Sequence, residues 1–164
     1  MAMTLEDRVK LLEDKLEIIN FILAYSISVD SQAPNNREEF WLPDATVDMG
    51  QGPKPYETMM QTLYSDGFKT AQTQGIGHFT GAPHVEVNGD SAVATAYFQI
   101  LAADDRPFEL AAHGPSKGFR VWRLTVNRWE LKRTPKGWRV KARILRAFDN
   151  SAARQVLRQA TAAA

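Results

Sequence analysis

Asp30 and His78 are the residues of this 164-residue chain whose types and setting could support acid–base chemistry. Asp30 follows a long segment that predicts a helix, and His78 lies in the strand-like run Gly75–Phe79. A carboxylate that orients an imidazole is the usual way to obtain a general base at neutral pH. Each residue alone has an ordinary structural explanation, because Asp is common at helix ends and half-buried histidines are frequent. The pair gains meaning if the fold brings both side chains to one cavity, where they would act without a metal or a bound cofactor.

Tyr25, Arg146 and two polar residues of a late strand are further candidates for a site. Tyr25 could polarise a substrate carbonyl or donate a proton, and the alternative is a core tyrosine whose hydroxyl reaches the surface. By the two-residue period of a strand, Arg146 lies on the apolar face of the last strand. An arginine there requires a buried carboxylate, an anionic substrate group or a developing oxyanion as its partner. Thr125 and Asn127 either pair with neighbouring groups or bind a ligand.

Arg143 has the opposite parity to Arg146 and should point to solvent unless a β-bulge shifts the register of the strand. It is a candidate ligand contact all the same. Large side chains that we expect beside it at the substrate are Met60, Phe98 and Trp129. The three histidines form no metal-binding motif, so no metal site is predicted.

Composition excludes several classes of protein. The chain contains no cysteine, which rules out disulfides, thiolate metal sites and a cysteine nucleophile. Its net charge of +1 gives no general attraction to nucleic acid. No apolar run approaches the roughly 20 residues of a membrane span, and the first residues do not resemble a signal peptide. We therefore expect a cytoplasmic protein with no nucleic-acid or membrane partner.

A long amphipathic helix is predicted from Thr4, which can cap it, to about Ser28. Its apolar residues recur at spacings of four and three. This stripe predicts either an intramolecular core or a short helix seam against another subunit. The residues of the stripe are Leu5, Val9, Leu12, Leu16 and Ile19.

Shorter helices and a series of strands complete one α+β domain over residues 1–164. Helices segregated from an antiparallel sheet define this class, and a long helix across a strongly curved sheet encloses a conical cavity suited to a small molecule. Asn88–Asp90 predicts a hairpin turn, Asp104–Pro107 a strand break and Gly67 a helix end. The expected elements are a loop at 31–36, helices at 37–41, 56–64 and 151–163, and strands at 46–49, 75–79, 85–87, 91–101, 119–132 and 138–146.

The chain resembles the SnoaL-like proteins of the nuclear transport factor 2 superfamily. The similar branch includes scytalone dehydratase, hexachlorocyclohexane dehydrochlorinase and bile-acid 7α-dehydratase. The resemblance extends from about Leu5 to Asn150 and depends on three short motifs. These are Ile19-Asn20-Phe21-Ile22-Leu23-Ala24-Tyr25 leading to Val29-Asp30, then Gly77-His78-Phe79, then Gly137-Trp138-Arg139-Val140.

The resemblance implies a cystatin-like fold, a cone-shaped barrel in which N-terminal helices pack on a strongly curved, mostly antiparallel sheet. It also implies a catalytic dyad of Asp30 and His78, with Tyr25 matching a tyrosine of the bile-acid dehydratase branch. Arg146 resembles the arginine of that enzyme, whereas Arg143 fits the arginine of the dehydrochlorinase. Both arginines therefore remain candidates for the residue that faces the cavity. Thr125 and Asn127 resemble a serine and an asparagine that occur together in scytalone dehydratase.

The activity implied by the resemblance is that of a cofactor-independent lyase of the dehydratase type. Its substrate would be a hydrophobic cyclic or polyketide-like small molecule. A double-bond isomerase or polyketide cyclase is an alternative in the same cavity. A second alternative is a non-catalytic ligand-binding or assembly module, like the small subunits of ring-hydroxylating dioxygenases. Members of the superfamily are commonly dimers or trimers, so a homodimer or homotrimer is expected.

Overall fold

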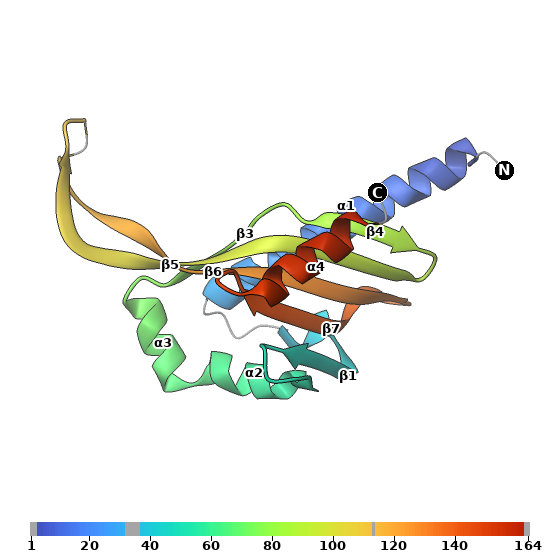
Figure 1. Cartoon of the computed structure of the whole chain (residues 1–164), viewed down its shortest axis with the longest axis horizontal. Coiled ribbons are helices and arrows are strands. Elements are labelled where there is room, and N and C mark those ends of the chain that lie inside the picture. The colour runs from blue at the N-terminus through green and yellow to red at the C-terminus, as the bar shows by residue number, and fades with distance from the viewer. Residues whose placement is uncertain (1–2, 32–36, 113, 163–164) are drawn as a thin grey trace.

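The computed structural model describes residues 3–31, 37–112 and 114–162, and it has the expected α+β architecture (Figure 1). The loop expected at 31–36 lies, after its first residue, outside the described residues. The elements are α1 (Leu5–Asp30), η1 (Arg37–Phe40), β1 (Trp41–Asp48), β2 (Lys54–Pro55), α2 (Tyr56–Tyr64), α3 (Asp66–Thr73), β3 (Gly77–Thr80), β4 (His84–Asn88), β5 (Ser91–Leu110), β6 (Gly114–Thr134), β7 (Gly137–Ala147) and α4 (Ser151–Thr161).

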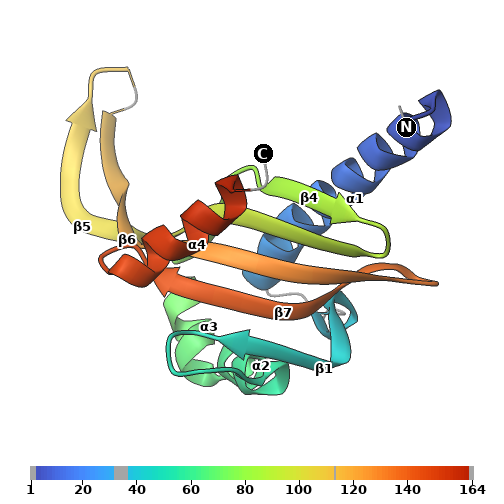
Figure 2. The ribbon, with the colours of Figure 1, turned by 45° about the vertical axis from the view of Figure 1, so that its right-hand side comes forward.

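One strongly curved sheet forms the centre of the molecule. Its strand order is β2-β1-β7-β6-β5-β3, with β4 also paired to β5. Only the β1–β7 pair is parallel among the described strands. Helix α1 lies against one face of the sheet and α4 crosses the other, as Figures 1 and 2 show. The sheet is open, and α1 covers the concave face on which the main core is built.

Alternation along β6 divides the side chains between these two faces. Val126 is fully buried with Ala153 and Val156 beneath α4. Trp129 and Leu131 belong instead to the main core, together with Ile18 of α1. Residues of β6 with the same parity as Trp129 therefore face the interior between the sheet and α1.

Helix α1 begins where the sequence predicts, because Thr4 and Asp7 form a reciprocal capping box. The core side of the helix differs from the expectation. The buried residues include Ile18, Ile22 and Val29, whereas most of the predicted stripe is exposed. Leu5, Val9, Leu12 and Leu16 are 73%, 46%, 67% and 59% exposed, and Ile19 alone packs partly on the core. The intramolecular interpretation of the stripe is wrong for the first four residues.

A β-bulge in β7 decides which arginine faces the interior. Leu131 pairs with Val140 but Glu130 pairs with Ala142, so Lys141 is an extra residue in the strand. The bulge shifts the parity of all later residues. Arg143 is consequently buried on the inner face, 4% exposed. The prediction from uninterrupted alternation that Arg146 shares the face of Trp138 and Val140 is wrong.

Arg146 instead joins β7 to β1. Its Nη2 donates to Asp48 Oδ2 at 2.6 Å and its Nη1 donates to the Asp48 carbonyl at 3.0 Å. Asp48 also accepts hydrogen bonds from the backbone N–H groups of Gly50 and Gly52 at 2.8 and 3.1 Å. The carboxylate thus organises the turn that follows β1, and Arg146 has a structural partner.

The hairpin of β5 and β6 extends well beyond the sheet as a two-stranded arm (Figure 2). The predicted turn at Asn88–Asp90 is present between β4 and β5, with Gly89 at φ +57°. The strand break predicted at Asp104–Pro107 is wrong, because β5 continues to Leu110 and pairs with β6 across irregularities near that point. Gly67 does not end the helical region either, since α3 follows α2 directly.

The Asp48 contacts make stability depend on pH. Hydrogen bonding by Arg146 is the main reason that the pKa of Asp48 lies below its usual value. An aspartate whose pKa is lower in the folded than in the unfolded protein stabilises the fold when it is ionised. This stabilisation is fully present at pH values above the unfolded-state pKa of about 3.9, and it is lost as the pH falls through the folded-state pKa. Asp48→Asn should therefore lower the free energy of unfolding by about 1–3 kcal/mol at about pH 7 and by a smaller amount at about pH 3, below the unfolded-state pKa.

Urea denaturation followed by tryptophan fluorescence across this pH range measures both values. Asp66→Asn is the matched control, because Asp66 makes an exposed ion pair with Lys69, which should contribute little. A destabilisation by Asp48→Asn that is the same at every pH would contradict the prediction.

Candidate functional site

The last residue of α1 and the second residue of β3 are joined by two hydrogen bonds. His78 Nδ1 lies 2.5 Å from Asp30 Oδ1, and the His78 backbone N–H donates to Asp30 Oδ2 at 2.6 Å. An ionised carboxylate only accepts, so in the neutral imidazole Nδ1 carries the proton and Nε2 keeps its lone pair. No described residue makes a hydrogen bond to Nε2. This arrangement can remove a proton from a molecule placed at Nε2.

Two further contacts fix the end of α1 against its neighbours. Ser26 and Thr80 are hydrogen-bonded at 2.6 Å, one helical turn before the Asp30 contact. Gln72 of α3 donates from Nε2 to the Val29 carbonyl at 2.7 Å. The helix is 26 residues long, about 39 Å at 1.5 Å per residue, so its end would otherwise be free to diverge from β3. The position of Asp30 is thus set by several elements rather than by one loop.

The His78 ring contacts two aromatic side chains. Its centroid is 5.9 Å from that of Phe68 and 5.6 Å from that of Phe98. The His78 side chain is 8% exposed, and that of Asp30 is 29% exposed. A ring nitrogen in apolar surroundings is shielded from competing water, which strengthens its interaction with a bound molecule.

A hydrogen-bonded series of polar residues crosses the inner face of the sheet. Arg143 Nε donates to Asn127 Oδ1 at 2.9 Å, and Asn127 Nδ2 donates to Thr125 Oγ1, also at 2.9 Å. Thr125 Oγ1 in turn donates to the Phe98 carbonyl at 3.3 Å. All four residues are buried. The chain of hydrogen bonds fixes the amide orientation of Asn127 so that its oxygen faces the guanidinium.

Arg143 is a buried cation without a carboxylate partner among the described residues. Its guanidinium instead lies 5.3–5.5 Å from the ring centroids of Tyr25, Phe98 and Trp129, within cation–π range. Burial lowers the pKa of Arg143, and the neighbouring Tyr25 opposes this shift through charge and hydrogen bonding. An arginine remains protonated nevertheless, so a positive charge faces the interior.

Phe98 links the two halves of the site, because its ring contacts both His78 and Arg143. Beside it lies a cavity of about 40 Å³, whose lining includes Ile100, Thr125 and Leu145. This cavity has room for about one water molecule, whereas small-molecule sites usually occupy about 300–1,000 Å³. A molecule larger than water would therefore have to displace side chains in order to enter this cavity.

The structure brings together most of the residues singled out from the sequence. Met60 is buried in the main core, and it is Met59 whose sulfur lies 3.7 Å from Arg143 Nη1. Arg146 lies at the β1–β7 junction. The neighbours that sequence reasoning missed are Met59 and Phe68; Phe68 falls just after the glycine expected to end a helix. The residues brought together are Tyr25, Asp30, His78, Phe98, Thr125, Asn127, Trp129 and Arg143.

Within the described ranges, no group of three or more His, Cys, Asp or Glu residues is arranged to hold a metal ion. The described helices also include none that is long and apolar enough to cross a membrane.

Comparison with known proteins defines the family. The SnoaL-like domain matches residues 10–144, and the chain belongs to this family. An NTF2-like protein with a cystatin-like fold from Novosphingobium aromaticivorans is 27% identical with a TM-score of 0.78, over 96% of this chain and 99% of that one. None of the curated proteins matches the sequence.

Two more distant structures share the fold. One is a protein from Novosphingobium aromaticivorans that carries the provisional name scytalone dehydratase. Its sequence is 16% identical to this chain and its structure superposes with a TM-score of 0.62, and the match covers 83% of this chain and 85% of that one. A provisionally named dehydratase of the NTF2-like family from Streptomyces avermitilis is also 16% identical, with a TM-score of 0.61 over 84% and 98% of the two chains. At this identity the likeness concerns the fold alone.

Proposed function

We propose that this protein is a cofactor-independent lyase of the dehydratase type, acting on a hydrophobic cyclic hydroxy-carbonyl compound. The observation that carries the proposal is the Asp30–His78 hydrogen bond of 2.5 Å, which leaves Nε2 as a lone-pair base in an apolar setting. Dehydratase names among the structural neighbours agree with it.

In the proposed reaction, His78 Nε2 takes the proton from the carbon next to the substrate carbonyl. The C–H electron pair moves into an enolate, and negative charge develops on the carbonyl oxygen. The enolate then forms the C=C bond as the β-hydroxyl leaves with the proton from Nε2–H. Water is released and His78 returns to its neutral form. Asp30 keeps the ring in one tautomer and stabilises the transient imidazolium.

Arg143 is the residue suited to stabilise the enolate. Its charge is buried and is oriented by Asn127 before a substrate arrives, so it needs no reorganisation when negative charge develops. Tyr25 lies beside the guanidinium and can share the same oxygen as a hydrogen-bond donor. The proposal thus replaces Arg146 with Arg143 as the electrostatic partner of the base.

The first test is turnover by the His78 variant. Candidate substrates are 3-hydroxycyclohexanone and hydroxytetralones, with formation of the enone or aromatic product followed by ultraviolet absorbance. Exchange of the α-proton with D₂O, measured by NMR, reports the base independently of the leaving group. His78→Ala should slow both processes by roughly 10²–10⁴-fold, the usual contribution of a positioned base. Asp30→Asn should also slow them, because it removes the acceptor that fixes the tautomer.

His84→Ala is the matched control, since His84 forms an exposed pair with Glu86 at 3.5 Å on the neighbouring strand. Equal losses in the His78 and His84 variants, or wild-type protein without turnover and without proton exchange, would contradict the proposal. Turnover of 3-cyclohexenone to its conjugated isomer, with no dehydration, would identify an isomerase that uses the same base.

The second test separates the two arginines. Arg143→Met should lower kcat by about 10²–10³-fold, the usual effect of losing one oxyanion donor. Arg146→Met should instead lower the melting temperature, because it leaves Asp48 without its charged partner. Rates per folded molecule, measured below the melting transition of each variant, distinguish the two effects. A loss of kcat in Arg146→Met as large as that in Arg143→Met would reject the assignment.

A further inference from the structure

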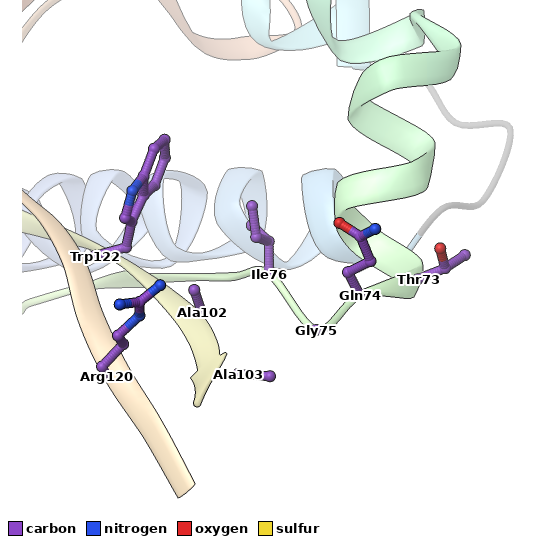
Figure 3. A pocket seen from close by; sticks show the side chains of 8 residues that line it. All are labelled: Thr73, Gln74, Gly75, Ile76, Ala102, Ala103, Arg120 and Trp122. Carbon is purple, nitrogen blue, oxygen red and sulfur yellow. The ribbon is translucent and has the colours of Figure 1, made fainter. Parts of the chain in front are cut away.

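A hollow at the root of the β5–β6 arm is separate from the small cavity beside Phe98. We name it the arm pocket, and its volume is about 720 Å³. Figure 3 shows that the turn between α3 and β3 forms one wall and the arm the other. The side chains of Ile76 and Trp122 project to the same side in this view. The residues that line the pocket include Gln74, Ile76, Ala102, Arg120 and Trp122.

The arm pocket continues the sheet face that carries His78. His78 pairs with Ile100 across β3 and β5. Ile76 precedes His78 by two residues and Ala102 follows Ile100 by two, so alternation places all four on one face. Two strand residues span about 7 Å. A molecule of three or more rings in the arm pocket would therefore extend toward the proposed base.

A bulge gives the arm pocket its aromatic wall. Ile100 pairs with Arg123 but Leu101 pairs with Val121, so Trp122 is an extra residue of β6. Trp122 is 58% exposed, although indole rings are usually largely buried. An exposed indole beside a hollow presents a flat surface on which a planar ring can stack.

The arm pocket also holds an available positive charge. Arg120 makes no hydrogen bond or ion pair with any described residue. The nearby carboxylate of Asp104 is engaged by Arg106, through hydrogen bonds of 3.2 and 3.1 Å from Nε and Nη2. Arg120 contributes only a minor part of the lowering of the Asp104 pKa, after the hydrogen bonds from Arg106. Its fork of N–H donors matches the geometry of a carboxylate.

We propose that the arm pocket binds the carboxylate end of a planar, polycyclic ligand, with a ring on Trp122 and the carboxylate on Arg120 and the Gln74 amide. Taken with the proposed function, on which this extension rests, the substrate is a cyclic hydroxy-ketone that carries a remote carboxylate. Binding in the arm pocket itself does not require catalysis.

The test compares 2-naphthoate with neutral 2-naphthalenemethanol, titrated into ¹⁵N-labelled protein while the backbone amide signals of Gln74, Ile76 and Ala102, present in every variant, are followed. Naphthoate should bind at least about tenfold more tightly, the equivalent of one charge-assisted contact. Arg120→Gln should abolish this preference, Trp122→Ala should weaken both probes, and Arg154→Gln on α4 should change neither.

Equal affinity of the two probes, or a preference that survives Arg120→Gln, would overturn the proposal. Failure to bind because a partner subunit fills the pocket would overturn it as well. His78→Ala should keep the naphthoate affinity, so failure of the catalytic proposal and failure of this one give different results.

An independent observation concerns the outer face of α1, defined by Leu5, Val9, Leu12 and Leu16. All four are exposed, and their spacings of four, three and four are those of the a and d positions of a heptad. Leu16 is two residues, about 200°, from the buried Ile18. The face therefore points directly away from the rest of its own domain.

Charges beside this face favour one orientation of a second helix. With Leu5 and Leu12 at d, the g positions hold Arg8 and Lys15, and the e positions hold Glu6 and Glu13. In a parallel pair, g packs beside e of the partner, which places Arg8 against Glu13 of the second copy. An antiparallel pair would place e beside e and g beside g, and thus like charges together.

We infer that the outer face of α1 packs in parallel against α1 of a second copy of this chain. Light scattering after size exclusion should show a dimer whose dissociation constant rises about tenfold or more in Leu12→Asp, on the scale of one buried leucine. Arg8→Glu should weaken the dimer, and adding Glu13→Arg should restore it. A monomer at all concentrations, an unaffected Leu12→Asp dimer, or a stronger dimer with Arg8→Glu alone would reject the inference.

Discussion

A single buried positive charge is the constraint around which the interior is arranged. The guanidinium of Arg143 has lost most of its hydration, and no carboxylate among the described residues replaces it. Its stabilisation comes from the Asn127 oxygen and from the faces of aromatic rings contributed by α1, β5 and β6. A core selected only for stability has little use for such a charge. The presence of this buried charge is the physical argument for a site that receives negative charge.

The proposed base depends on a different kind of support. Both oxygens of Asp30 bind His78, one through the ring and one through the backbone, so the carboxylate cannot turn away without losing two contacts. The Ser26–Thr80 hydrogen bond secures the preceding turn of α1. Base and cation therefore both contact the Phe98 ring, and they are held by elements that are fixed separately.

The sequence alone was enough to predict which residues of a regular strand share a face. It was also enough to single out Asp30, at the end of α1, and His78 as a pair. Thr125, Asn127 and Trp129 share one face because β6 is regular from Arg123 to Lys132, and the capping box correctly begins α1 at Leu5. Arg143 and Arg146 were interchanged because one extra residue at Lys141 reverses parity, and no residue type marks that bulge. Periodicity also identified an apolar stripe on α1 but not which neighbour covers it, since tertiary packing used the opposite side, around Ile18.

The continuity of β5 gives the arm a mechanical meaning. One unbroken strand carries Phe98 on the inner face of the sheet, Ile100 paired with His78, and the far pairs of the arm up to Leu110. The arm is a two-stranded ribbon without helix cover, and the bulge at Trp122 lies where it leaves the sheet, at a place where strands bend. A molecule that contacts the outer end of the arm would therefore contact the same strand whose Phe98 ring touches both base and cation.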